Sequence, residues 1–159
     1  MRTTDSWLLL GAAVGAGAVG GFLVAFSSLV MPALRELPAA SGMRAMQSIN
    51  RNAKGPVVFG LLIGTAALAV ALVVRTIGDG GAVRALVVIG TILFVVGVVG
   101  VTGAVNVPLN EALAVREAGS PAAAAYWEEK FLGRWTTWNT VRALAGLGAC
   151  ASFAAALAQ

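Results

Sequence analysis

Four long runs of apolar residues divide this chain, and none of them carries a charged side chain. The uncharged stretches are residues 6–34, 55–74, 85–110 and 143–159. About 20 apolar residues are enough for a helix to cross the hydrocarbon of a bilayer. None of the runs alternates apolar and polar residues as a barrel strand does, and a backbone in lipid must satisfy its own hydrogen bonds. The pattern therefore predicts an all-α membrane protein with four transmembrane helices, at about residues 7–31, 56–74, 84–106 and 138–158.

Composition agrees with a membrane protein and leaves no room for a soluble domain. Hydrophobic residues make up 58% of the chain and charged residues 11%, and the mean hydropathy is +0.86; soluble proteins have roughly a quarter charged residues. A chain of 159 residues accommodates one domain, so residues 1–159 should form a single bundle. The first run resembles a signal peptide, because Arg2 precedes it and Ala16-Gly17-Ala18 resembles a cleavage site. It continues to about Met31, however, beyond the roughly 7–15 residues of a cleaved segment, so we expect a retained helix.

The connections predict further short helices. Met31-Pro32 is expected to end the first span, and Ser41 to cap a short helix over residues 42–54. One face of that helix would carry Met43, Met46, Gln47, Asn50 and Lys54, which favours an amphipathic helix at the membrane interface. Gly55-Pro56 should then start the second span, since proline is tolerated in a first helical turn.

The later connections differ from one another in character. Residues 75–84 contain a glycine-rich turn between antiparallel helices. Pro108 is expected to end the third span, and residues 111–119 to form a polar loop. Ser120-Pro121 has the pattern of a helix start, and the helix it begins should run into the fourth span as a helical extension. The result is an antiparallel four-helix bundle whose 32–55 and 107–137 loops share one side of the membrane.

Basic residues favour a cytoplasmic location for those two loops. The two loops hold seven lysines and arginines, which are Arg35, Arg44, Arg51, Lys54, Arg116, Lys130 and Arg134. The opposite side has three, which are Arg2, Arg75 and Arg84. Positive loops stay inside, so the two termini are expected outside and the protein in a bacterial inner (plasma) membrane. Three small-xxx-small pairs, namely Gly11 with Gly15, Gly17 with Gly21 and Gly60 with Gly64, predict close helix packing within the bundle, with a homo-oligomer as the alternative.

The residue composition argues against disulfides, histidine-ligated metal sites and nucleic-acid binding. Histidine is absent and Cys150 is the single cysteine, so an intrachain disulfide is impossible and histidine-ligated metals and haems are excluded. The net charge is only +4 and collects on no one face, which argues against nucleic acid as a partner. We expect no bound metal.

Polar and aromatic residues gather at the ends of the third and fourth runs. Trp127, Phe131, Trp135, Trp138 and Arg142 have helical spacing and form an aromatic stripe that ends in a cation, with Asn139 beside it. The stripe is either a belt of membrane anchors or a flat wall for a planar ligand. Asn106 and Asn110 share a helix face, so their amides could hydrogen-bond a ligand carbonyl or tie the third helix to Asn139 and Arg142.

Four sequence blocks resemble the integral-membrane anthrone oxygenase family. They are Met31-Pro32-Ala33-Leu34, Met46-Gln47-Ser48-Ile49-Asn50, Asn106-Val107-Pro108-Leu109-Asn110 and Trp135-Thr136-Thr137-Trp138-Asn139-Thr140-Val141-Arg142. The resemblance implies oxidation of an anthrone-like or other planar phenolic substrate, with O2 as co-substrate and no cofactor. Carried over to this sequence, the functional residues of the family fall on Asn50, Asn106, Asn110, Trp138, Asn139 and Arg142. Together with the residue patterns above, this makes Arg142, Asn106, Asn110, Asn139 and Glu111 the candidate catalytic residues, and Trp135, Trp138, Asn50, Gln47 and Met46 the candidate substrate contacts. Glu111 departs from the family pattern, in which a second asparagine often follows Asn110.

The implied chemistry needs no metal, because the enolate of an anthrone is electron-rich enough to reduce oxygen. Arg142 and the asparagine amides would stabilise the enolate oxygen, and Glu111 is either the base or a solvated loop acid. The expected ligands are a hydrophobic planar small molecule and membrane lipid. One alternative is a non-catalytic protein that binds a lipid, a quinone or a partner helix in the same cleft. Another is a metal site formed by Glu111, Glu128 or Glu129.

Overall fold

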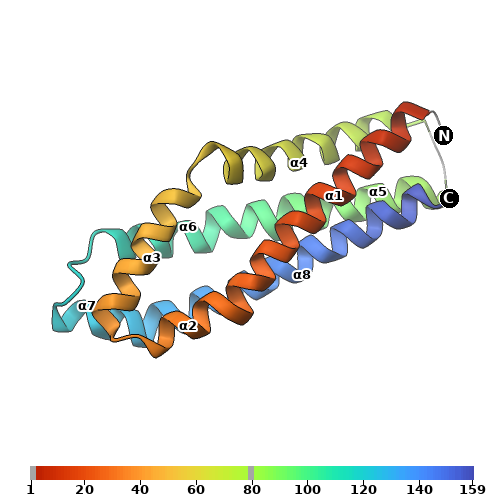
Figure 1. Ribbon diagram of the computed structural model, residues 1–159. Coiled ribbons are helices and arrows are strands. Elements are labelled where there is room, and N and C mark those ends of the chain that lie inside the picture. The colour runs from red at the N-terminus through yellow and green to blue at the C-terminus, as the bar shows by residue number, and fades with distance from the viewer. Residues whose placement is uncertain (1–2, 79–80) are drawn as a thin grey trace.

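Four helical rods, long and apolar enough to span a membrane, make up the protein (Figure 1). The structure is a computed structural model that describes residues 3–78 and 81–159. The candidate spans are Asp5–Glu36, Pro56–Arg75, Gly81–Ala114 and Pro121–Leu157. The described residues form no β-strand, so the predicted all-α membrane bundle is confirmed. Three of the rods extend beyond the predicted spans, because the helices continue into the polar residues at one end.

The rods contain both α-helical and π-helical segments. The first comprises α1 (Thr3–Ala25), the π-helical η1 (Phe26–Val30) and α2 (Met31–Glu36); α3 (Ala39–Ala53) follows, and the second rod is α4 (Pro56–Arg75). The third comprises α5 (Gly81–Ile92), η2 (Leu93–Gly100), η3 (Thr102–Asn106) and α6 (Val107–Ala114). The fourth comprises α7 (Pro121–Ala125), η4 (Tyr126–Phe131) and α8 (Leu132–Leu157).

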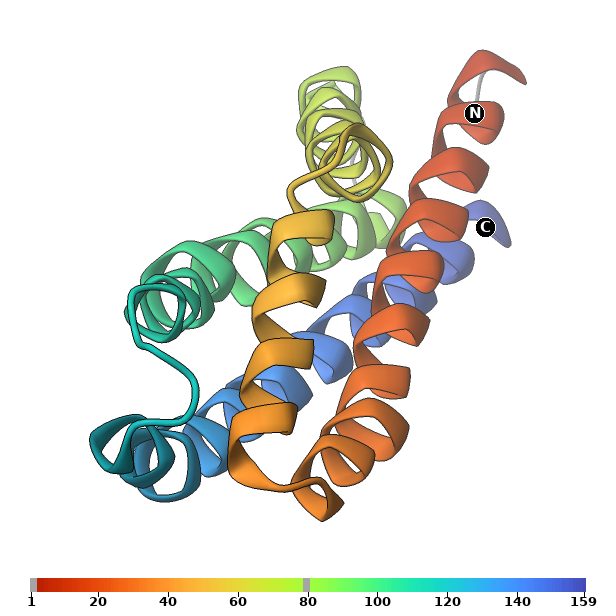
Figure 2. The same ribbon diagram turned by 60° about the vertical axis from the view of Figure 1, so that its left-hand side comes forward.

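The rods run antiparallel, and the two ends of the bundle differ. The start of α1, the end of α4 and the end of α8 lie at one end, as Figure 1 shows. At the other end α3 crosses from α2 to α4 (Figure 2). One buried apolar cluster lies between α1, α4, α5 and α8, and a second lies beneath α3 and joins it to α2, η4 and the start of α8. The predicted juxtaposition of the two polar loops at one end is therefore confirmed.

Pro32 and Pro108 do not end their helices, which corrects two predictions. In both cases a π-helical segment comes directly before the proline's α-helix: the Met31 N–H donates to the Phe26 carbonyl, and the Val107 N–H donates to the Thr102 carbonyl. Proline lacks an N–H, and its ring clashes with the carbonyl one turn earlier. The wider π-turn accommodates both effects, and such local adjustments are typical of membrane helices. The first rod ends instead at the extended Leu37, before Pro38.

The short helix after the first rod starts earlier than predicted. Pro38 is the N-cap of α3, and the Ser41 N–H donates to the Pro38 carbonyl, so Ser41 lies inside the first turn and its side chain does not cap the helix. The predicted face is buried at Met43 and Met46, whereas Lys54 is the C-cap residue of α3 and is exposed. The predicted cap at Ser120 is also correct: its hydroxyl accepts from the Ala123 N–H at 3.2 Å.

The predicted glycine pairs divide into packed and open positions. An added Cβ would contact a neighbouring helix at Gly11, Gly15 and Gly17, whereas nothing lies within 4 Å at Gly21, Gly60 and Gly64. The intramolecular packing prediction is therefore wrong for Gly21, Gly60 and Gly64. The tightest crossing of α1 and α8 lies at Gly20, where an added Cβ would come 2.9 Å from the Leu147 backbone nitrogen.

We expect Gly20→Ala to destabilise the protein by about 1–3 kcal/mol, because the new methyl group would press against the backbone of α8. The measurement is unfolding by sodium dodecyl sulfate titration, followed by tryptophan fluorescence. Gly21→Ala is the matched control: its Cβ meets open space and alanine favours helix, so its stability should be unchanged or slightly higher. Equal stabilities of the two variants would contradict the close crossing.

Candidate functional site

Three polar side chains are buried where the fourth rod packs against the first and third rods. Asn106 ends η3, and Asn139 and Arg142 lie one turn apart on α8; each is at most 7% exposed. Burying an amide or a guanidinium in an apolar surrounding costs several kcal/mol unless it is paired. The hydrogen bonds of these residues therefore decide whether they are structural.

Arg142 is held by neutral groups alone. Its Nη1 donates to Thr102 Oγ1 at 2.9 Å, and its Nη2 donates to Asn139 Oδ1 at 2.6 Å. The guanidinium carbon lies 5.7 Å from the centre of the Trp135 ring, a cation–π distance. Within the described part of the chain no carboxylate forms an ion pair with Arg142. A buried cation without a counter-ion suits a site that receives a negatively charged oxygen.

Asn139 joins α8 to the first rod. Its Nδ2 donates to the Leu23 carbonyl and to Ser27 Oγ, both at 2.7 Å, while its Oδ1 accepts from Arg142. Ser27 lies in the π-helical η1, so the amide contacts the place where the helical register changes. Asn139 therefore both clamps two helices and orients the guanidinium.

Asn106 and Asn110 bind the same residue of α8. Asn106 Nδ2 donates to the Trp135 carbonyl at 3.3 Å, and Asn110 Oδ1 accepts from Trp135 Nε1 at 2.8 Å. The prediction that these two amides tie the third helix to Asn139 and Arg142 is wrong in the residue they meet. The amides bond Trp135, and Thr102 links the third helix to Arg142. Asn110 links the two helices through its amide oxygen. Asn106 links them through its amide nitrogen, and its amide oxygen has no partner.

The aromatic stripe is a buried stack. The Trp127 and Phe131 rings lie 5.3 Å apart at an interplanar angle of 16°, and the Phe131 and Trp135 rings 6.2 Å apart at 22°. All three side chains are buried in the cluster beneath α3, so the stack is part of the core and not an exposed belt. Trp138 departs from the stripe and is 37% exposed.

Three buried side-chain atoms in the described segments lack a hydrogen-bond partner, and all three belong to predicted site residues. They are Asn50 Nδ2, Asn106 Oδ1 and Arg142 Nε. Buried polar groups are almost always paired, so an unpaired one calls for an explanation such as a ligand or water. Asn50 Nδ2 and Arg142 Nε are N–H donors and Asn106 Oδ1 is an acceptor, so each of them could pair with an oxygen-bearing group of a ligand or with water.

The other predicted residues have structural or peripheral positions. Gln47 Nε2 donates to the Leu113 and Arg116 carbonyls at 2.9 and 3.0 Å and so holds the loop after α6. Met46 is fully buried in the core beneath α3. Glu111 is exposed on α6, outside the buried network. Among the described residues no three histidine, cysteine, aspartate or glutamate side chains gather as metal ligands, so Glu111, Glu128 and Glu129 do not form such a group.

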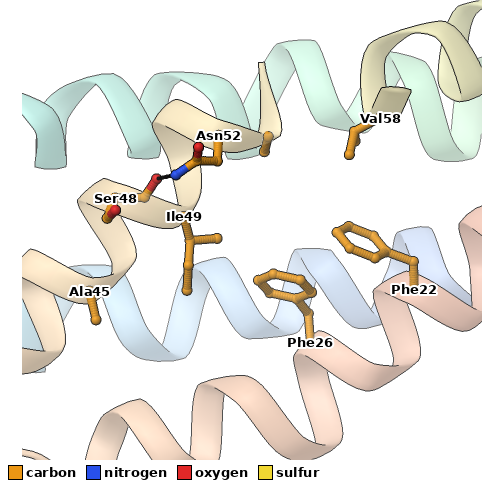
Figure 3. Close-up of a pocket in the computed structure, with 8 residues that line it drawn as sticks. Phe22, Phe26, Ala45, Ser48, Ile49, Asn52 and Val58 are labelled. Atoms are coloured by element: carbon orange, nitrogen blue, oxygen red, sulfur yellow. Dashed lines mark hydrogen bonds between the residues drawn. The ribbon is translucent and has the colours of Figure 1, made fainter. Parts of the chain in front are cut away.

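Sequence reasoning missed Thr102, Ser27 and the pair Phe22 and Phe26. Thr102 and Ser27 bind Arg142 and Asn139, and as hydroxyl residues within apolar runs they carried a weak signal. Phe22 and Phe26 are one turn apart, with ring centres separated by 4.8 Å, and they line a groove of about 530 Å³. Figure 3 shows both rings reaching from the first rod toward Ile49 and Val58.

Comparison with known proteins supports the resemblance noted in the sequence. A family model described as anthrone oxygenase matches residues 50–152, which is more than half of the chain. The matched segment contains Asn106, Asn139 and Arg142. No curated protein and no solved structure matches the chain.

Proposed function

The chain belongs to the anthrone oxygenase family, which supports an oxygenase-like role in general, and from this premise we propose that it is a membrane-embedded oxygenase. Its substrate would be a planar phenolic or polyketide-like molecule, O2 would be the co-substrate, and no bound cofactor would take part. We place the protein in the bacterial inner membrane with the 32–55 and 107–137 loops cytoplasmic, on the basis of their basic residues.

The observation that carries this proposal is the set of unsatisfied atoms at the buried network. Arg142 keeps an unpaired Nε–H and has no carboxylate partner among the residues described, and Asn106 keeps an unpaired amide oxygen. A substrate oxygen that becomes negatively charged would pair with the guanidinium, and a phenolic hydroxyl would donate to the amide. Both groups are held in place by protein hydrogen bonds before any substrate arrives, which is the requirement for electrostatic preorganisation.

The reaction balances with molecular oxygen as the only oxidant. Loss of a proton from the benzylic carbon of an anthrone leaves an enolate, which transfers an electron to O2; the resulting radical pair forms a C–O bond and, with a proton, a hydroperoxide. Cleavage of the O–O bond with loss of the second C–H proton leaves a new carbonyl and releases water. One oxygen atom enters the product, and the other leaves with the two hydrogens.

Arg142 would act on the first step by stabilising the enolate oxygen, an effect worth about 3–4 kcal/mol for one well-placed donor. We assign no base role to Glu111, because its exposed carboxylate lies outside the buried network. Water at the polar end of the bundle would take the proton.

The purified protein in detergent should accelerate oxygen uptake by anthrone about 100-fold or more over a protein-free sample. An oxygen electrode measures the rate. Mass spectrometry after reaction under ¹⁸O2 should find one labelled oxygen in the anthraquinone. Equal rates with native and heat-denatured protein would reject the proposal.

Binding without catalysis is the second candidate, and the groove beside Phe22 and Phe26 favours it. In that case a hydrophobic molecule would co-purify unchanged, and a panel of phenols would cause no oxygen consumption.

A further inference from the structure

A membrane-side groove lies between the first rod, α3 and α4. Phe22 and Phe26 form one wall, α3 contributes Ser48, Ile49 and Asn52, and Val58 of α4 lies opposite, around a volume of about 530 Å³. Figure 1 shows α1 and α4 spreading apart toward α3, and Figure 3 shows the groove where they have separated. Phe22 is 44% exposed and Val58 36% exposed, so the groove opens at the surface of the membrane-spanning helices.

The chemistry of the lining selects the kind of ligand. No charged side chain lines the groove, so nothing there pairs with the phosphate of a lipid headgroup. Two phenyl rings with centres 4.8 Å apart provide an aromatic wall, and aromatic rings pack favourably against other rings. Polar groups occur only on α3: Asn52 Nδ2 donates to the Ser48 carbonyl at 2.9 Å, which leaves the amide oxygen and the Ser48 hydroxyl to meet one polar substituent.

One side chain, Phe26, lies between the groove and the buried polar network. Phe26 lines the groove, and its ring centre lies 6.0 Å from that of Trp135. Trp135 in turn bonds Asn110 through Nε1 and lies under the Arg142 guanidinium. Phe26 is also the first residue of the π-helical η1, where the helical register changes. An apolar molecule held in the groove would therefore be one aromatic ring away from the network that holds Arg142.

We propose that this groove is the binding and entry site through which an uncharged aromatic molecule passes sideways from the bilayer, with Phe26 between it and the Trp135–Arg142 network. The inference rests on the proposed function, because it assigns a place of entry to the same substrate. It commits to a neutral, ring-containing ligand; an acyl chain of a phospholipid is the competing occupant.

The test measures binding of tritiated 9,10-anthraquinone to the full-length protein in lipid nanodiscs by scintillation proximity. Ala53→Phe and Val58→Phe add bulk to the groove from α3 and from α4, and each should raise the Kd by about tenfold or more. Ala67→Phe makes the same kind of change at an exposed position of α4 that does not line the groove, and its Kd should equal that of the wild type. Two groove variants on different helices guard against a single misfolded protein.

Unchanged binding in both groove variants would overturn the inference. A second result would also overturn it: native mass spectrometry shows a phospholipid bound to the wild type and absent only from the groove variants, and the wild type has no affinity for the quinone. The two proposals fail separately. If the wild type binds the quinone but consumes no oxygen with anthrone, the groove stands and the enzymatic proposal falls; if it consumes oxygen while the groove variants alter neither Kd nor KM, the groove falls.

Discussion

Arg142→Gln should lower the rate of anthrone oxidation by about 100- to 1,000-fold while leaving the protein folded. The substitution removes the guanidinium that we place against the enolate oxygen. Folding should hardly suffer, because the buried cation has no ion-pair partner among the described residues and its burial is itself unfavourable. Thr102 loses one bond but keeps its own donation to the Val98 carbonyl at 2.6 Å. Oxygen uptake and the unfolding midpoint of the same preparation provide the two measurements.

Arg134→Gln is the matched control, since Arg134 is an exposed arginine two turns earlier on α8. Its rate should remain within about twofold of the wild type, as expected for an exposed charge outside the network. Arg142→Lys keeps a charge but loses the planar fork that binds both Thr102 and Asn139, so its rate should fall between those of the wild type and Arg142→Gln. A full rate in Arg142→Gln, or a loss of rate that merely follows a loss of folding, would contradict the catalytic role.

Asn139→Leu should destabilise the protein by about 2–4 kcal/mol, because it removes three hydrogen bonds of buried or half-buried groups. The Leu23 carbonyl loses a side-chain donor, and the Arg142 Nη2 loses its acceptor, both in buried surroundings. The half-buried Ser27 hydroxyl loses one of its two partners and keeps Thr140. Leucine also has a different shape from asparagine at a position with no exposed surface. Unfolding by sodium dodecyl sulfate titration in mixed micelles measures the change.

Thr140→Val is the comparison for this effect. Thr140 neighbours Asn139 and bonds the same Ser27 hydroxyl at 2.9 Å, but it is exposed. Its loss should cost less than about 1 kcal/mol, since exposed hydrogen bonds contribute little. If the two variants were equally stable, the clamp between α1 and α8 would not depend on Asn139.

The hydrogen-bond partners show where sequence reasoning reached its limit. Asn106 and Asn110 are four residues apart on one helix, and this spacing alone predicts that they share a face. Which residue they meet depends on how the third rod is rotated and shifted against α8. That rotation places Trp135 opposite both amides and brings Thr102 to Arg142. Helical periodicity contains no information about the rotation of a neighbouring helix.

The prolines show a second limit. A local rule states that proline breaks a helix, and Pro56 follows it as the start of α4. Pro32 and Pro108 do not, because a π-turn before each of them keeps the rod continuous. In hydrocarbon a broken helix would expose unpaired backbone groups, so the register change costs less than an interruption.

The sequence by itself determined that the protein is a helical membrane bundle with four spans, and that its polar residues gather at one end. Those results follow from the lengths of the apolar runs and from the alternation of antiparallel spans, which are properties of the chain read in order. Only the tertiary structure decided that the aromatic stripe is a buried stack, that Trp138 and Glu111 lie outside it, and that a groove opens beside Phe26. The reason is physical: burial and cavities depend on how side chains from different helices interlock, and that interlocking is set by the rotation and crossing of the helices.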